Sequence, residues 1–246
     1  MRLDSRGGVS IAELVSYSPL LVAAALLCQR HGFERPSGWV FILILCIIRI
    51  TGSACNMVTY RAQSTSLYQA VFILDSVGIS PLLFATLGLL TRILTWVRAH
   101  SETSIRSKHF RFAQLIFTGG LILSIVGGIN SRAAASPGTL SQVAIVLYFL
   151  GLAACVFFEI SAWAGTVACG SVPASERSTV YAVVAALPLI FTRILFSALA
   201  VFLHDSTFGI VRRSTGVYVG MVVIQEALLV VMYTIVGWQL DRLDYN

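Results

Sequence analysis

Residues 38–60 read GWVFILILCIIRITGSACNMVTY, and this stretch decides the fold class. It is long enough to cross a bilayer as an α-helix, because a spanning helix needs about 20 mostly apolar residues. Its one charged residue, Arg49, lies near its middle. An apolar helix with a central charge predicts a membrane protein whose interior is polar.

Six further stretches share this length and apolar character, and short segments with charged residues, proline or glycine separate them. A chain of this length leaves no room for a soluble domain beside such a bundle. We therefore expect an all-α integral membrane protein, a seven-transmembrane-helix bundle that forms a single domain over residues 1–246. The expected helices cover residues 11–29, 38–60, 67–91, 112–130, 140–165, 179–203 and 216–239.

The composition excludes a soluble fold and several chemistries. Of the 246 residues, 57% are hydrophobic and 11% are charged, whereas a soluble domain carries about a quarter charged residues. The five cysteines lie in apolar runs without a CxxC pair or a metal-ligand spacing, so we expect no metal and no cofactor. The HExxH, GxSxG and P-loop patterns are absent. The only lysine, Lys108, falls in an expected loop, so no helical lysine can form a retinal Schiff base.

The basic residues, 17 against 11 acidic ones, are interpreted as loop charge that sets orientation rather than as a nucleic-acid surface. Because more of them lie on the side reached by the C-terminus, we expect a lumenal N-terminus and a cytosolic C-terminus in the endoplasmic reticulum membrane. The N-terminal side holds Arg2, Arg6, Arg61, Arg132, Arg212 and Arg213, and the other side Arg30, Arg35, Arg92, Arg98, Arg106, Lys108, Arg111, Arg177 and Arg242.

The expected helix over residues 112–130 carries small residues at a regular spacing. Gly120, Ser124 and Gly128 recur every four residues, and its core holds no charge. Small residues at this spacing let helix backbones approach closely in lipid. We interpret this segment as a packing helix.

Four ionisable residues fall deep in expected helices, although each costs about 2.5–3.5 kcal/mol there. Arg49, Asp75, Arg193 and Glu226 come from four different helices. At 1.5 Å per residue they lie roughly 12–16 Å from the N-terminal side. Two acids and two arginines at one level predict a shared polar centre. In the structural alternative, Arg49 with Asp75 and Arg193 with Glu226 are neutralising pairs that only set helix register.

Two further acids and two prolines accompany these four charges. Glu13 and Glu159 lie nearer the two ends of their expected helices, where a structural role is the simpler interpretation. Pro81 and Pro188 lie near Asp75 and Arg193, where a bend frees backbone carbonyls. By helical spacing, the residues that we expect to line a pocket are Asn56, Tyr60, Phe72, Tyr148, Glu159, Trp163 and Tyr233.

A set of motifs extends over nearly the whole chain. It comprises Arg30-His31-Gly32-Phe33, Ser37-Gly38-Trp39, Arg49-Ile50-Thr51-Gly52, Gly78-Ile79-Ser80-Pro81-Leu82-Leu83, Leu87-Gly88-Leu89-Leu90, Arg92, Pro188, Arg193 and Glu226. The set resembles a family of fungal seven-helix membrane proteins, most of which carry only a domain-of-unknown-function label. Members of this general type resemble the membrane terpene cyclases of fungal meroterpenoid pathways, such as the ascofuranone-pathway cyclase.

The resemblance implies an acid-initiated terpene cyclase that needs no metal. Its substrate would be a lipophilic prenylated molecule with a terminal epoxide, held within membrane lipid, and no nucleic acid is expected as partner. Opening an epoxide requires a proton donor, and an apolar site keeps a carboxylic acid protonated at neutral pH. We expect Asp75 and Glu226 as the catalytic acids, with Asp75 the donor among apolar neighbours. Arg49 or Arg193 would hold one acid ionised.

The main alternative is a translocator or sensor of lipids or small molecules, because midplane charges also mark transport paths. Against it, the sequence shows no internal repeat and no evident pair of broken helices. A receptor with seven helices is a third possibility, which the short loops disfavour. The oligomeric state is left open.

Overall fold

The computed structural model describes residues 5–32, 38–59, 65–100, 107–130, 138–169, 173–202 and 215–240. Throughout these ranges the regular structure is helical, and seven helical stretches are long and apolar enough to cross a membrane. The seven-helix expectation is therefore confirmed. The elements are α1 (Ser5–His31), α2 (Trp39–Thr59), α3 (Thr65–Val77), α4 (Ile79–His100), α5 (Ser107–Asn130), α6 (Thr139–Cys169), α7 (Ala174–Phe202), α8 (Thr215–Tyr218), the π-helix η2 (Val219–Val223) and α9 (Ile224–Gln239).

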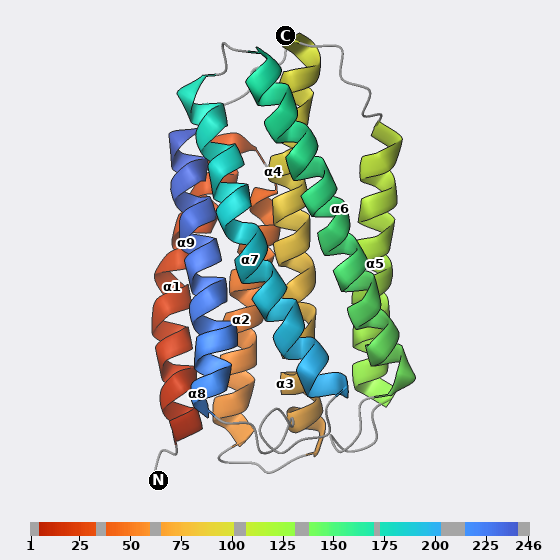
Figure 1. Ribbon diagram of the computed structural model, residues 1–246. Helices are drawn as coiled ribbons and strands as arrows, with labels where there is room; N and C mark the ends of the chain where they lie inside the picture. The colour runs from red at the N-terminus through yellow and green to blue at the C-terminus, as the bar shows by residue number, and fades with distance from the viewer. Residues whose placement is uncertain are drawn as a thin grey trace.

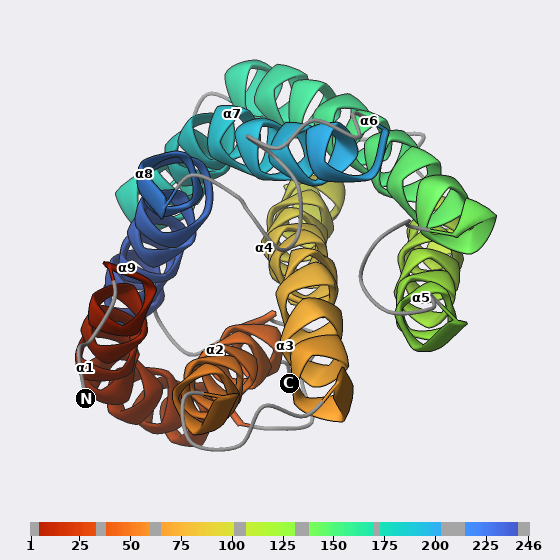
Figure 2. The ribbon, with the colours of Figure 1, turned by 90° about the horizontal axis from the view of Figure 1, so that it is seen from below.

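Five of the spans form a closed ring, seen along the bundle axis in Figure 2. Around it, α1 packs on α2, α2 on α3 and α4, α4 on α7, α7 on α9, and α9 on α1. Outside the ring, α6 packs on α4 and α7, and α5 packs on α6. The helix α1 begins and α9 ends at opposite ends of the bundle, which we call the N-end and the C-end (Figure 1).

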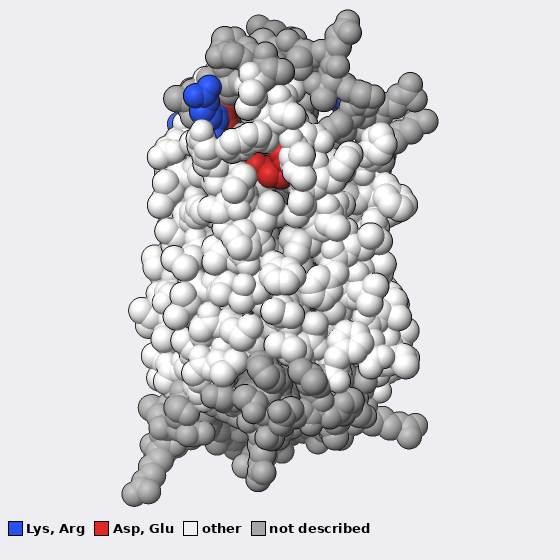
Figure 3. All heavy atoms as spheres, in the orientation of Figure 1, with Lys and Arg blue, Asp and Glu red and all other residues white. Residues whose placement is uncertain are grey.

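The flank of the bundle has the character of a lipid-facing surface. Figure 3 shows a flank that is almost entirely uncharged between the two ends, with basic atoms near the C-end and one small group of acidic atoms below them. Large apolar side chains point outward along this band, among them Val15, Leu115 and Val167, each more than two-thirds exposed. A water-facing surface would not bear so many, so these faces are matched to hydrocarbon.

Two spans depart from regular α-helix beside the ring interior. The third was expected as one helix over residues 67–91, but it consists of α3 and α4, which meet at a turn at Gly78. Pro81 follows in the first turn of α4, where a missing N–H is tolerated. The seventh span carries the π-helix Val219–Val223. The sequence showed no evident pair of broken helices, whereas the structure interrupts the third span and places a π-helix in the seventh.

The end of α1 and the start of α2 contact the end of α9 at the C-end of the ring. Gly32 and Gly38 have φ of 85° and 80°, a backbone conformation that glycine adopts without strain. Gly32 directly follows α1, and Gly38 directly precedes α2. The His31 ring lies against the Trp39 ring, with centroids 5.5 Å apart, and its Nε2 lies 2.9 Å from the carbonyl oxygen of Gly237 at the end of α9. These contacts thus tie three helix ends together.

The small residues of α5 bring it close to α6, as the spacing predicts. A Cβ added to Gly120 would come within 2.8 Å of the Tyr148 ring. At Gly127, an added Cβ would come 2.5 Å from Oγ and 2.9 Å from the backbone nitrogen of Ser141. Since backbone atoms cannot rotate away, the α5–α6 spacing depends on glycine at this position.

We predict that Gly127→Ala lowers stability by about 1–3 kcal/mol, the usual effect of overpacking a filled interface. The measurement is thermal unfolding of the purified protein in detergent. Gly8→Ala is the matched control, because an added Cβ there meets nothing within 4 Å and alanine favours helix. Equal midpoints for the two variants would contradict the close approach of α5 and α6.

Candidate functional site

Two arginines and two carboxylates from four helices meet inside the ring. Arg49 on α2 donates from Nε and Nη2 to the two carboxylate oxygens of Glu226 on α9. Its Nη1 donates to Oδ1 of Asp75 on α3 at 2.9 Å. One guanidinium therefore joins both acids, and its pairing with Glu226 is bidentate, the strongest geometry for such a pair.

Arg193 on α7 completes the group. Its Nε donates to Oε1 of Glu226 at 2.6 Å, and its Nη2 lies 3.4 Å from Oδ1 of Asp75. The same Nη2 donates to the backbone carbonyl of Asp75 at 2.6 Å, and Nη1 donates to Ser197 Oγ at 2.6 Å. The carbonyl is available because the helix breaks at Gly78, so the interruption of the third span supplies a ligand for Arg193.

These four residues form what we call the ion quartet: Arg49, Asp75, Arg193 and Glu226. The shared polar centre that the sequence predicts is confirmed, and it is one network rather than two separate pairs. Each arginine contacts both acids. The apolar setting expected for Asp75 is wrong for its carboxylate, which contacts both guanidinium groups. With both acids ionised, the quartet has no net charge.

A fifth charged residue, Glu13 on α1, reaches the same level. The helix was expected from residue 11, but it begins at Ser5, which places Glu13 about 12 Å from the helix start at 1.5 Å per residue. Its side chain is 6% exposed. Ser53 Oγ donates to Glu13 Oε2 at 2.5 Å. Each of the five ring spans thus contributes one charged residue at this depth. Of the three acids in this group, Glu13 is the one with no arginine ion pair among the described residues.

Tyr218 on α8 connects Glu13 to the quartet. Its hydroxyl lies 3.3 Å from Glu13 Oε1 and 3.4 Å from Asp75 Oδ1. The α-helical repeat did not indicate this residue, because Tyr218 and Glu226 are eight residues apart and would point in different directions. The π-helix between them adds a residue to the turn, which brings both side chains to the ring interior.

Tyr17 adds a buried hydroxyl group to the site. It lies one helical turn beyond Glu13 on α1 and is fully buried. Its hydroxyl has no hydrogen-bond partner among the described residues. A buried hydroxyl usually has a partner, so this one is available to a bound molecule or water. The sequence signal was its i+4 spacing from Glu13.

A hydrogen-bonded stripe leads from Glu13 toward the N-end. Asn56 Nδ2 donates to Ser10 Oγ at 2.7 Å, which joins α2 to α1 one turn before Ser53 and Glu13. Asn56, which we expected to line a pocket, is therefore directed at α1. Tyr60, also expected to line the pocket, lies outside the described residues.

The remaining expected pocket residues do not join the quartet. Phe72 lies one turn before Asp75 and is partly buried. The buried hydroxyls of Tyr148 and Tyr233 pair with Ser80 at 2.7 Å and Thr86 at 2.8 Å, which ties α4 to α6 and α9. These two tyrosines therefore hold helices together on the C-end side of the quartet.

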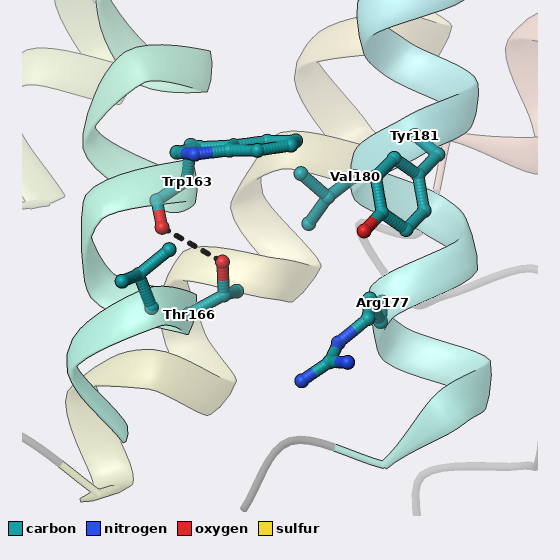
Figure 4. A pocket seen from close by; sticks show the side chains of 6 residues that line it. Trp163, Thr166, Arg177, Val180 and Tyr181 are labelled. Atoms are coloured by element: carbon teal, nitrogen blue, oxygen red, sulfur yellow. Dashed lines mark hydrogen bonds between the residues drawn. The ribbon is translucent and has the colours of Figure 1, made fainter. Parts of the chain in front are cut away.

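Glu159 and Trp163 on α6 lie outside the ring. Glu159 is buried, and neither of its carboxylate oxygens has a hydrogen-bond partner among the described residues. The expectation that Trp163 lines the central pocket is wrong: its side chain is 44% exposed and borders a separate hollow between α6 and α7 (Figure 4). Helical spacing cannot distinguish an inward from an outward face when both are apolar.

Fold and site together define a seven-helix integral membrane protein with an intramembrane ion quartet and an additional acid. The chain belongs to the family described as domain of unknown function DUF7702, whose profile matches residues 3–243. No curated protein matches the sequence. Within the described residues, no group of three histidine, cysteine or acidic side chains is arranged to hold a metal ion.

We predict that Arg193→Leu destabilises the bundle by about 3–5 kcal/mol, because it leaves two buried carboxylates with one guanidinium. The readout is the folded yield and the thermal unfolding midpoint in detergent. The double variant Arg193→Leu with Glu226→Gln restores charge balance and should recover part of the loss. A double variant that is less stable than Arg193→Leu alone would show that the two residues are not coupled through charge.

Proposed function

We propose that this chain is a membrane-embedded cyclase that protonates the terminal epoxide of a prenylated, lipophilic substrate and so initiates ring closure. The substrate class comes from the resemblance to meroterpenoid-pathway membrane cyclases. The observation that carries the proposal is a buried acid, Glu13, in excess of a neutral ion quartet, next to an unpartnered tyrosine hydroxyl. Acid-initiated cyclisation requires such a protonated acid in an apolar site.

Charge balance selects Glu13 rather than Asp75 as the proton donor. The quartet is neutral with Asp75 and Glu226 ionised, so an ionised Glu13 would add an uncompensated buried charge, which is strongly unfavourable. A protonated Glu13 also satisfies the hydrogen bonds of Tyr218. The phenol has one proton and lies near two carboxyl groups, so it donates to Asp75 while its oxygen accepts from Glu13.

The proposed step balances in atoms and charge. The Glu13 carboxyl proton passes to the epoxide oxygen as the adjacent carbon–oxygen bond breaks, which leaves an alcohol and a carbocation. An alkene of the prenyl chain attacks the cation and closes a ring. The cation is then quenched by loss of a proton to a carboxylate or by an internal hydroxyl. Aromatic faces stabilise a developing cation, and Tyr17, Tyr218 and Phe196, whose ring centroid lies 6.2 Å from that of Tyr218, are close to this position.

A translocator is the second candidate, and the structure gives it a specific support. The third span is interrupted at Gly78 and the seventh carries a π-helix, and both irregular segments lie beside the charges. Discontinuous helices at the membrane midplane are typical of transporter binding sites. Uptake of a labelled substrate into sealed vesicles without its chemical conversion would favour this candidate.

We predict that Glu13→Gln abolishes most turnover of a prenylated epoxide, by about 10²–10⁴-fold, the range for loss of a general acid. Products formed by purified protein in lipid vesicles are quantified by mass spectrometry. Asp75→Asn should also lower turnover, because it unbalances the quartet. Ser18→Ala, on the exposed side of α1, is the control and should keep full activity. Wild-type turnover by a folded Glu13→Gln protein would remove Glu13 from the mechanism.

We also propose that the N-terminus is lumenal and the C-terminus cytosolic in the endoplasmic reticulum, from the distribution of basic residues. A glycosylation site fused before residue 1 should be modified, and one fused after residue 246 should not. Opposite termini are required by seven spans. Modification only at the C-terminus would reverse the orientation, whereas modification at both would contradict the number of spans.

A further inference from the structure

A hollow of about 320 Å³ lies between α6 and α7, outside the ring and near the C-end. It opens to the flank of the bundle. In Figure 4, α6 forms one wall and α7 the other, and the Arg177 guanidinium extends into the space between them. The lining residues are Trp163, Thr166, Val167, Arg177, Val180 and Tyr181.

Arg177 is an uncompensated cation in this hollow. The neighbouring acid, Glu176, is turned into the bundle, where Arg92 contacts its Oε1 from Nη2 at 2.9 Å and from Nε at 3.2 Å. The Arg177 side chain is exposed and has no ion pair or hydrogen bond with the residues that the structure describes. The lining contains no acid, and the Thr166 hydroxyl already donates to the Trp163 carbonyl at 2.8 Å.

The walls have the amphipathic character of a membrane interface. Trp163 and Tyr181 are 44% and 55% exposed, and their rings meet edge to face with centroids 5.7 Å apart. Tryptophan and tyrosine prefer the level of lipid headgroups. The hollow also lies at the membrane boundary, because the fifth apolar span ends at Val167 and the sixth begins at Glu176. Arg177 is therefore at headgroup depth, with the aromatic pair one turn closer to the hydrocarbon.

From this arrangement we propose that the hollow binds the headgroup of an anionic phospholipid from the leaflet at the C-end. The lipid phosphate accepts hydrogen bonds from the Arg177 guanidinium, and its acyl chains run past Val180 and the Trp163–Tyr181 pair toward the hydrocarbon. Charge complementarity selects an anionic lipid, since the hollow offers a cation and no acid. The site is separate from the ion quartet, so its occupancy does not depend on the cyclase proposal.

The test uses the full-length protein in nanodiscs that contain equal amounts of phosphatidylglycerol and phosphatidylcholine. The protein is released from the nanodiscs in the mass spectrometer, and native mass spectrometry counts the lipid molecules of each kind that stay bound to it. The wild type should retain phosphatidylglycerol preferentially, and Arg177→Gln should reduce that preference about fivefold, as expected for losing one cationic contact near a membrane surface. Arg177→Lys should keep most of it, because the charge remains.

Arg111→Gln is the matched control, since it removes an equal charge from an exposed position on α5 at the same end. It should leave the preference unchanged. Equal loss in Arg111→Gln and Arg177→Gln would overturn the site in favour of general surface charge, and so would equal retention of both lipids by the wild type. Displacement of phosphatidylglycerol by millimolar inorganic phosphate would reassign the hollow to a free anion.

Discussion

The neutralisation of charge inside lipid is the constraint on which this bundle depends. An isolated ionised side chain in hydrocarbon is strongly unfavourable, and no water is present to compensate. Arg49 and Arg193 each contact both Asp75 and Glu226, so four helices have one mutual arrangement in which every charge is balanced. The arrangement of α2, α3, α7 and α9 around one interior follows, because separating any of them would separate the charged partners. Apolar packing between these helices and the lipid provides no comparable preference.

The break at Gly78 and the π-helix both make contacts of this charge network possible. At Gly78 a Cβ would come 3.0 Å from Nη2 of Arg49, so glycine gives the guanidinium its space, and the break after α3 frees the Asp75 carbonyl for Arg193. The π-helix rotates Tyr218 to the interior. Irregular backbone at membrane depth is tolerated where it faces protein. Here it creates the contacts between the quartet and Glu13, which a regular helix would not place together.

Much of this could be predicted from the sequence, for physical reasons that differ between residues. The seven spans follow from length and apolarity, and the meeting of Arg49, Asp75, Arg193 and Glu226 follows from depth alone, because helical rise is constant. Glu13 was misplaced since Gly7, Gly8 and Ser10 have loop character in the sequence, yet all lie within α1. Tyr218 depended on a π-helix that no periodic pattern indicates. Trp163 was misplaced because lipid makes outward faces as apolar as inward ones.

The order of the charges along the chain has a consequence for biogenesis. Arg49 and Asp75 belong to the second and third spans, and Arg193 and Glu226 to the sixth and seventh. Opposite charges therefore arrive in consecutive segments as the nascent chain enters the bilayer. Each pair can form within a helical hairpin soon after synthesis, so neither arginine remains unpaired in lipid until a helix distant in the sequence is inserted. The two hairpins then join through the contacts from Arg49 to Glu226 and from Arg193 to Asp75. The ion quartet thus connects the helices that are synthesised first with those that are synthesised last.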